Sequence, residues 1–217
     1  MGGVSLLDGG NLRLKKEISP PLALGLYALA LLLLAFAFRG PFDPWKGMTI
    51  AMGVLLAGSL AVKAVRDRIV PTLSRVGIGL AAGAVLYGLT RLVVVLLDRV
   101  WPAWASHART LSAWKSGHST FFLAATLVMI VIAEETLWRG VIARFSIERF
   151  GRAFGIVAGA ALYAAAHAVT LNPLLLVAAF GCGIYWGILY AATDDLTAPI
   201  VSHLAWDAMI LFVLPVV

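Results

Sequence analysis

Long uncharged apolar stretches separated by short polar segments dominate the chain. A helix of about 17 to 25 residues is needed to cross a bilayer, and seven stretches reach that length. They are 20–38, 48–65, 76–98, 119–138, 153–170, 173–192 and 197–217. The pattern therefore predicts an all-α, polytopic membrane helix bundle with about seven transmembrane helices. No polar or low-complexity stretch is long enough for a second domain, so we expect a single domain over residues 1–217.

Composition agrees with a chain that mostly faces lipid. The 217 residues are 61% hydrophobic and 13% charged, against about a quarter charged in ordinary soluble domains, which excludes a water-soluble globule. The single cysteine, Cys182, excludes a disulfide framework and a cysteine metal cluster. The basic residues that give the net charge of +6 lie mostly between the apolar stretches. We therefore expect them to set the membrane orientation and not to bind nucleic acid.

The basic residues are distributed unevenly between the two sides of the predicted membrane. With the amino terminus inside, the inner segments hold 11 of the 17 Lys and Arg residues and the outer segments hold 5. The inner group includes Arg13, Lys15 and Lys16. The positive-inside rule then predicts a multi-pass protein of the cell membrane with a cytoplasmic amino terminus. The outer segment 99–118 carries three tryptophans among polar residues and is predicted to form a short helix at the headgroup level.

A few ionisable residues interrupt the apolar stretches. An ionisable side chain at the bilayer centre costs about 2.5 to 3.5 kcal/mol on insertion scales, so each one within a span is a candidate functional residue. They are Glu134, Glu135, His167, His203 and Asp207. They identify the second half of the chain as the part that carries chemistry.

Helical spacing separates these residues into roles. Glu134 and Glu135 are adjacent, about 100° apart around a helix, so only one of them can face a reacting atom. Glu135 and Arg139 lie four residues apart, the favourable order for a structural ion pair. Glu134 is left without a local cationic partner, which makes it the candidate general base. His203 and Asp207 are also four apart and share a face.

A second spacing argument brings two of the residues to one depth. If a helix runs from Glu134 to about Phe150 and reverses at Gly151, the turn lies midway between positions 134 and 167. Glu134 and His167 would then meet across an antiparallel hairpin, each about 25 Å from the turn. His203 fits this scheme less well, because it lies only about 10 Å from the turn at 193–197. It would need a strongly tilted or broken helix to reach the same place.

Three short motifs now show a resemblance. Residues 134–139 read EETLWR and match Glu-Glu-x-x-x-Arg, residues 163–167 read YAAAH and approximate Phe-x-x-x-His, and residues 203–207 read HLAWD and match His-x-x-x-Asn/Asp. In this order, each within an apolar stretch, they resemble the CPBP family of intramembrane proteases. That family includes Rce1-type CAAX prenyl endopeptidases and Abi proteins. The motifs cover about a third of the chain, with further similarity between Gly183 and Ile200.

The resemblance implies hydrolysis of a peptide bond at membrane depth. It assigns activation of the attacking water to Glu134 together with His167. It assigns stabilisation of the oxyanion to His203 and Asp207, and a supporting role to Glu135 and Arg139. The expected partners are the lipid bilayer and a membrane-associated protein or peptide substrate, either prenylated or carrying a leader or C-terminal sorting tag.

Two positions of the motifs raise separate questions. Tyr163 replaces the commoner phenylalanine, and we expect it to serve for packing. An ionised Asp207 accepts hydrogen bonds, so it can donate to an oxyanion only when protonated. Alternatively, it orients the His203 ring or binds a metal.

The motif residues leave a cofactor alternative open. Glu134, His167, His203 and Asp207 could hold a zinc ion with an open position. No His-Glu-x-x-His helix is present, and a water activated by a glutamate needs no metal. We therefore favour a metal-free mechanism with no cofactor, with zinc as the alternative.

A second class of function uses the same residues. In a proton- or ion-coupled transporter, Glu134, His167 and Asp207 would form a relay. Transporters commonly show two related halves and interrupted helices, and the sequence shows neither. An intramembrane endopeptidase of glutamic or metallo type is the preferred interpretation.

Overall fold

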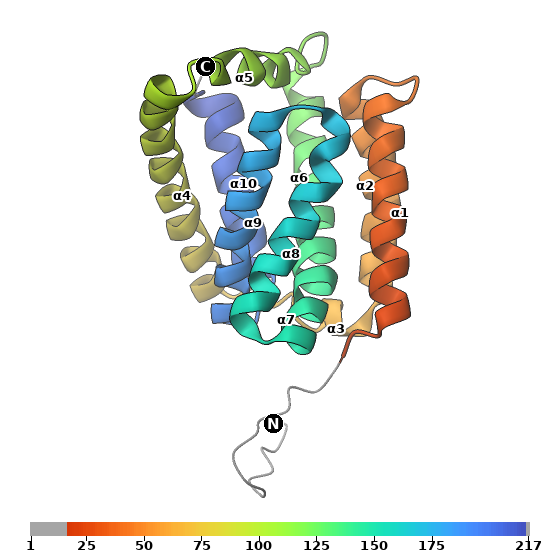
Figure 1. Ribbon diagram of the computed structural model, residues 1–217. Coiled ribbons are helices and arrows are strands. Elements are labelled where there is room, and N and C mark those ends of the chain that lie inside the picture. Colours follow the sequence, from red (N-terminus) through yellow and green to blue (C-terminus); the bar gives the residue numbers. More distant parts are fainter. Residues whose placement is uncertain (1–16, 216–217) are drawn as a thin grey trace, which may run out of the picture.

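The computed structural model describes residues 17–215, which form helices and no strand (Figure 1). Arg13, Lys15 and Lys16, which the orientation argument counts, lie outside the described residues, as do the last two residues of the predicted span 197–217. The α-helices are α1 (Pro20–Arg39), α2 (Pro44–Ala61), α3 (Lys63–Arg66), α4 (Leu73–Val100), α5 (Trp104–Ala113), α6 (Thr120–Leu137), α7 (Arg144–Phe150), α8 (Arg152–His167), α9 (Pro173–Thr193) and α10 (Thr197–Ala208). A 3₁₀ turn, η2 (Ala168–Thr170), follows α8, and π-helical segments follow α6 and α10, namely η1 (Trp138–Ala143) and η3 (Met209–Val213). The predicted all-α bundle is confirmed.

Five helical segments of the described chain are long and apolar enough to cross a membrane. They are Pro20–Arg39, Leu73–Val100, Thr120–Phe150, Arg152–Thr170 and Pro173–Thr193. Of the two other predicted spans, 48–65 ends early because Val62 is extended and terminates α2. The last span, Thr197–Val213, is a shorter apolar helix. The chain is therefore a multi-pass membrane protein whose last apolar helix is shorter than its five membrane-crossing segments.

The sequence sets several helix boundaries through capping. Asp43, Ser119 and Asn172 accept hydrogen bonds from backbone N–H groups three residues later, at the starts of α2, α6 and α9. Proline occupies the first helical turn of α1, α2 and α9, where its missing N–H costs nothing. These signals lie in the short polar segments between apolar stretches, so the polar pattern fixes where each helix begins.

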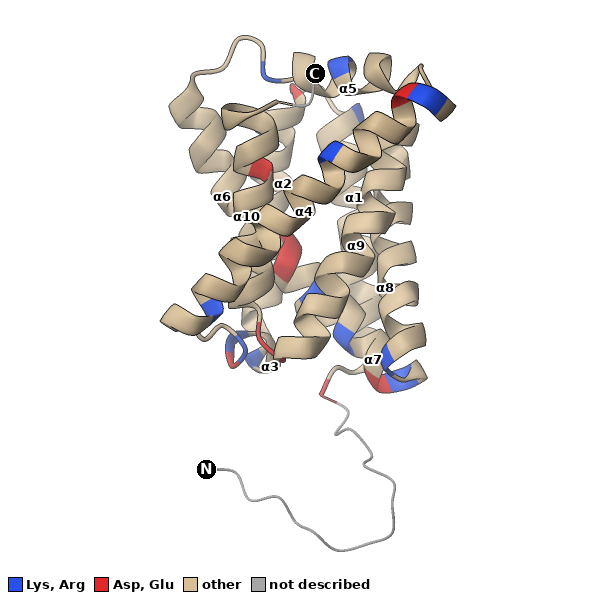
Figure 2. Cartoon of the chain, turned by 90° about the vertical axis from the view of Figure 1, so that its left-hand side faces the viewer, with Lys and Arg blue, Asp and Glu red and all other residues tan. Residues whose placement is uncertain are grey.

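Helix α6 lies at the centre of the bundle (Figure 1). It packs against α2, while α4 packs mainly on α10, and α8 packs on α9. Val131, Ala133 and Leu137 of α6 are fully buried. Figure 2 shows Lys and Arg mostly near the two ends of the bundle. The second half of α6 is therefore a shielded place for polar side chains, and Glu135 and Thr136 are fully buried there.

The predicted short helix of the outer segment is present as α5, which lies across one end of the bundle (Figure 1). Trp104 is buried, and its indole N–H donates to the Asp98 carboxylate at 2.7 Å. The helix is thus joined to the end of α4. Its place at the headgroup level stays a prediction.

The hairpin predicted from the spacing of Glu134 and His167 is confirmed. Helices α6, η1 and α7 run without a break from Thr120 to Phe150. The chain then reverses at Gly151, whose φ of +80° favours glycine. On the returning helix, a Cβ at Gly155 would lie 2.4 Å from Ile147 Cα. The close approach of α7 and α8 therefore depends on the absence of a side chain at this position.

Replacement of Gly155 by Ala is expected to destabilise the protein by about 1 to 3 kcal/mol, the usual cost of overpacking. The new Cβ would meet backbone atoms of Ile147, which cannot move without separating the two helices. Gly181→Ala in α9 is the matched control, because a Cβ there meets nothing within 4 Å. That variant should gain up to about 1 kcal/mol from helix propensity. Detergent or denaturant unfolding of both variants checks the prediction, and equal stabilities would contradict it.

Candidate active site

Glu134 lies in the last turn of α6 and is 5% exposed. Its two carboxylate oxygens face different partners on α8. Oε2 accepts a hydrogen bond from the Tyr163 hydroxyl at 2.7 Å, and Oε1 lies 3.7 Å from Nε2 of His167. The structure thus brings together the carboxylate and the imidazole that the hairpin argument paired.

His167 is the last residue of α8 and is also 5% exposed. Its Nδ1 lies 2.9 Å from the Tyr163 carbonyl oxygen, one helical turn back. A carbonyl only accepts, so Nδ1 carries the proton in this contact. In the neutral ring this assignment leaves the Nε2 lone pair directed toward Glu134. The contact of Nδ1 therefore sets the tautomer of the ring and directs Nε2 toward Glu134.

The expectation that Tyr163 serves for packing is incomplete. Its ring does pack, against Trp138 and edge-on against His167. Its hydroxyl, however, is hydrogen-bonded to the buried Glu134 carboxylate. The sequence placed Tyr163 on the face of His167, but it did not show that Glu134 would come within reach of the hydroxyl.

The predicted ion pair between Glu135 and Arg139 is confirmed, with Oε1 and Nη1 3.1 Å apart. The same Oε1 also lies 2.7 Å from Nδ1 of His203. Glu135 is fully buried and Arg139 is 2% exposed. Within the described part of the chain, Glu135 Oε2 and Arg139 Nη2 have no hydrogen-bond partner. Glu135 is therefore the junction between α6 and α10.

Trp186 of α9 is a site residue that the sequence reasoning missed. Its ring stacks on His203, with centroids 3.7 Å apart and planes 25° apart. The Arg139 guanidinium lies between the Trp186 ring, at 5.0 Å, and the Tyr163 ring, at 4.8 Å. The side chains of Tyr163, Arg139, Trp186 and His203 form one continuous column. Trp186 belongs to an apolar helix, and its polar neighbours come from distant segments, so no local signal pointed to it.

The column makes Trp186→Leu more damaging than Trp186→Phe. Phenylalanine keeps a ring for stacking, whereas leucine loses both the stack, worth about 0.5 to 1.5 kcal/mol, and the cation–π contact, worth up to about 2 kcal/mol when desolvated. The leucine variant should therefore be about 1 to 2 kcal/mol less stable than the phenylalanine variant. Unfolding of the two variants side by side measures this difference. Equal losses of stability would show that the Trp186 ring contributes only its volume.

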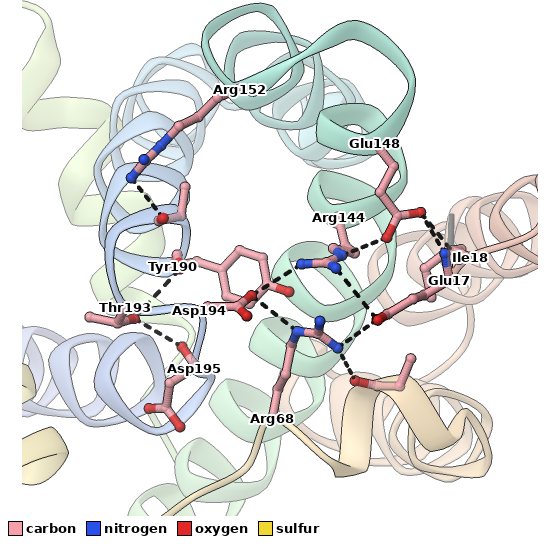
Figure 3. Close-up of polar contacts among 12 residues, drawn as sticks. Glu17, Ile18, Arg68, Arg144, Glu148, Arg152, Tyr190, Thr193, Asp194 and Asp195 are labelled. Atoms are coloured by element: carbon pink, nitrogen blue, oxygen red, sulfur yellow. Dashed lines mark hydrogen bonds and ion pairs between the residues drawn. The ribbon is translucent and has the colours of Figure 1, made fainter. Parts of the chain in front are cut away.

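The contact between His203 and Glu135 follows from how the turn between α9 and α10 is held. Asp194 in this turn accepts from Arg68 at 3.2 Å and from Arg144 at 3.1 Å (Figure 3). The backbone N–H of Leu196 donates to the Arg68 carbonyl. The turn is therefore held against the Arg144 side chain and the Arg68 backbone. Nine positions separate Arg144 from Glu135 along the continuous helix α6–η1–α7, and nine separate Asp194 from His203, of which the last six lie in α10.

Of the two ways considered for His203 to reach the site, a broken helix is wrong. Helix α10 is unbroken from Thr197 to Ala208, and the π-helical η3 begins only after His203 and Asp207. The sequence could not show where the turn is held, because Arg68 and Arg144 come from segments far from position 194. A shared Glu17 carboxylate, 2.8 Å from Arg68 and 3.5 Å from Arg144, completes the ion-pair network (Figure 3).

Asp207 faces the other side of the His203 ring. Its Oδ2 lies 3.4 Å from Nε2, so the two ring nitrogens are directed at two carboxylates, those of Glu135 and Asp207. Of the three roles considered for Asp207, this contact fits orientation of the His203 ring. A donor role would still need a protonated carboxyl.

A π-helical segment directly follows the two glutamates, which the sequence analysis did not predict. Segment η1 contains Arg139, and all six of its residues are buried. Single π-helical turns occur often at functional sites because they re-aim side chains within a continuous helix. Here the turn lies between the buried glutamates and the part of the helix that carries Arg144.

The four residues considered for zinc are not arranged as a ligand set. Among the described residues, no group of three or more His, Cys, Asp or Glu side chains could hold a metal ion. Glu134 pairs with His167, while His203 is held between Glu135 and Asp207. The donors are divided between two pairs, so we derive no chemical step through a metal.

Residues 116–209 match the model of a family described as type II CAAX prenyl endopeptidase Rce1-like. The match covers 94 of the 217 residues, and this segment is similar to that family. All six residues singled out by the motifs lie within it, so the resemblance to the CPBP family of intramembrane proteases is confirmed. Comparisons with the curated proteins and with the solved structures give no match.

The matched segment supports intramembrane endopeptidase activity in general terms. It begins just before α6 and ends just after α10, so it contains both sides of the candidate site. Helices α1, α2 and α4 precede it and pack around it.

Proposed function

We propose that the protein hydrolyses a peptide bond of a membrane-associated protein or peptide with a water molecule activated by Glu134 and His167. One observation carries the proposal. Glu134 Oε1 and His167 Nε2, two proton acceptors, face each other at 3.7 Å inside a helix bundle. The separation exceeds a direct hydrogen bond, and one water can donate a proton to each.

The chemistry follows from this placement. A water that donates to Oε1 and Nε2 directs its lone pair outward, toward the carbonyl carbon of the substrate. As the water oxygen forms its bond to the carbonyl carbon, one proton of the water passes to the Glu134–His167 pair. The same pair then delivers that proton to the departing amide nitrogen as the carbon–nitrogen bond breaks. No covalent enzyme intermediate is needed.

His203 is the proposed donor to the oxyanion that develops on the carbonyl oxygen. When protonated, it donates from both nitrogens, and Glu135 accepts the hydrogen bond from Nδ1. Nε2 faces Asp207 at 3.4 Å, and in the reaction its N–H donates to the oxyanion in place of this long contact. Trp186 restricts the ring from its face. In this scheme Glu135 and Arg139 support His203 and do not touch the substrate.

The substrate class follows from the setting. We propose a prenylated C-terminal peptide or a leader or sorting tag, because a site buried among apolar helices suits a peptide already held in the membrane. We further propose that the end with α7 and the amino terminus faces the cytoplasm of a cell membrane, and that water enters from there. Cysteine accessibility to an impermeant reagent at position 67, before α4, and at position 117, between α5 and α6, tests the orientation.

The test of the function is cleavage by purified protein. We expect incubation with a mixed library of membrane peptides, farnesylated C-terminal peptides included, to give defined cut sites by mass spectrometry. A preparation lacking both the Glu134 carboxylate and the His167 imidazole is the control. Cuts that appear in both preparations would come from a contaminant. An absence of cuts unique to the active protein would overturn the proposal.

The same assay with a chelator addresses zinc. We expect cleavage to continue after chelation and dialysis, because the described side chains offer no metal-holding group. Loss of activity that returns with added Zn²⁺ would instead establish the zinc alternative.

A further inference from the structure

Tyr163 combines three contacts that no other described residue makes. Its hydroxyl donates to Glu134 Oε2 at 2.7 Å, and its carbonyl oxygen lies 2.9 Å from Nδ1 of His167. Its ring meets the His167 ring edge-on, with centroids 4.6 Å apart. It is 5% exposed, so the hydroxyl is shielded from bulk water. One residue therefore contacts both members of the Glu134–His167 pair.

The hydroxyl also decides how Glu134 is turned. A carboxylate at the end of a flexible side chain can present either oxygen or swing away from its partner. Here Oε2 is occupied by the Tyr163 hydroxyl, so Oε1 is the oxygen left to face His167 Nε2. A hydrogen bond to a charged group is stronger than one between neutral groups. A phenylalanine, the commoner residue of the motif, has the same ring but no donor.

We propose that Tyr163 is a positioning residue for hydrolysis, whose hydroxyl holds Glu134 in the orientation that activates water. The proposal rests on the proposed function, because it concerns the carboxylate that function assigns to the water. It predicts an effect on turnover that comes from one hydrogen bond and not from packing. Tyr163→Phe isolates this effect, since it removes the oxygen and keeps the ring that packs against Trp138 and His167.

The chain offers a matched control on the same helix. The Tyr27 hydroxyl, from α1, donates to the Leu162 carbonyl at 3.3 Å. Tyr27→Phe therefore also removes one tyrosine hydroxyl bonded to α8, one residue from Tyr163, but it leaves Glu134 untouched. We expect kcat of Tyr163→Phe to fall about tenfold, the factor that corresponds to a charge-assisted hydrogen bond of about 1.4 kcal/mol. KM should change less than about twofold, and Tyr27→Phe should keep the wild-type kcat.

The kinetic test uses the peptide that the wild type cleaves in the library assay. A purely structural role of the hydroxyl would lower thermal stability in both variants and leave kcat of the folded enzyme alone. If Tyr163→Phe and Tyr27→Phe have the same kcat, the proposal is overturned while the proposed function stands. If the wild type itself cuts no peptide, the proposed function fails, and with it any role of Tyr163 in hydrolysis.

Infrared difference spectroscopy tests the hydrogen bond without a substrate. The difference spectrum between wild type and Tyr163→Phe should contain a displaced carboxyl stretching band. The band should be missing when the same substitution is made in a Glu134→Gln background, because the responding group is then gone. A spectrum without that band in the wild-type background would overturn the assignment, whatever the kinetics show.

Discussion

Glu134→Gln is expected to lower kcat for peptide cleavage by about 10²- to 10⁴-fold, the usual contribution of a general base. Glutamine keeps the shape of the side chain and an oxygen that can accept from the Tyr163 hydroxyl, so the local packing of α6 against α8 should persist. What it loses is the ability to take a proton from water. The measurement is steady-state cleavage of the library-derived peptide, with thermal unfolding to show that the variant is folded.

Glu148→Gln is the control for loss of a carboxylate elsewhere on the same long helix. Glu148 pairs with Arg144 at the end of the bundle, away from His167. We therefore expect the kcat of the Glu148→Gln variant to stay within about twofold of wild type. Cleavage by Glu134→Gln at the wild-type rate would remove the basis of the proposed mechanism. If the variant instead lost the uptake of protons or ions by proteoliposomes, the transporter interpretation of the same residues would gain support.

Arg139→Met is expected to cost about 3 to 5 kcal/mol of stability, the largest loss we predict for a single substitution. The guanidinium is 2% exposed and pairs with a fully buried glutamate. Its removal leaves the Glu135 carboxylate buried without its cation, and an uncompensated buried charge is far more costly than a lost contact. Denaturant unfolding in detergent measures the loss.

The double variant Glu135→Gln with Arg139→Met separates charge from packing. It removes both charges and keeps an amide oxygen that can accept from His203, so it should recover most of the lost stability. Lys63→Met is the exposed counterpart, because Lys63 and Asp67 form an ion pair of the same spacing at the surface. That substitution should cost less than about 1 kcal/mol. A double variant as unstable as Arg139→Met would show that the burial of charge is not the cause.

The sequence predicted those features of the fold and site that depend on local spacing. The four-residue interval fixed the Glu135–Arg139 pair, and the equal intervals on either side of Gly151 brought Glu134 to His167. Both predictions use only helical geometry and one turn residue. The all-α bundle followed in the same way from the lengths of the apolar stretches.

The features that were missed depend on contacts between distant segments. The stack of Trp186 on His203 joins α9 to α10, and Trp186 has the same apolar surroundings in the sequence as many residues that only pack. The hydrogen bond of Tyr163 required knowing how α6 and α8 are rotated toward each other, and the π-helical η1 lies between them in the chain. The depth of His203 depended on where Arg68 and Arg144 hold the turn before it. Periodicity along one helix carries no information about these relations.

The turn between α9 and α10 also borders a polar hollow. Glu17, Lys63, Arg68 and Asp194 line this hollow at the end of the bundle, and charged groups of this kind favour contact with water. From the start of α10 at Thr197, six residues, about 9 Å at the helical rise, lead to His203. The proposed hydrolysis consumes one water per bond cleaved, and a charged hollow at this end would give bulk solvent a short way to the place where each one is used.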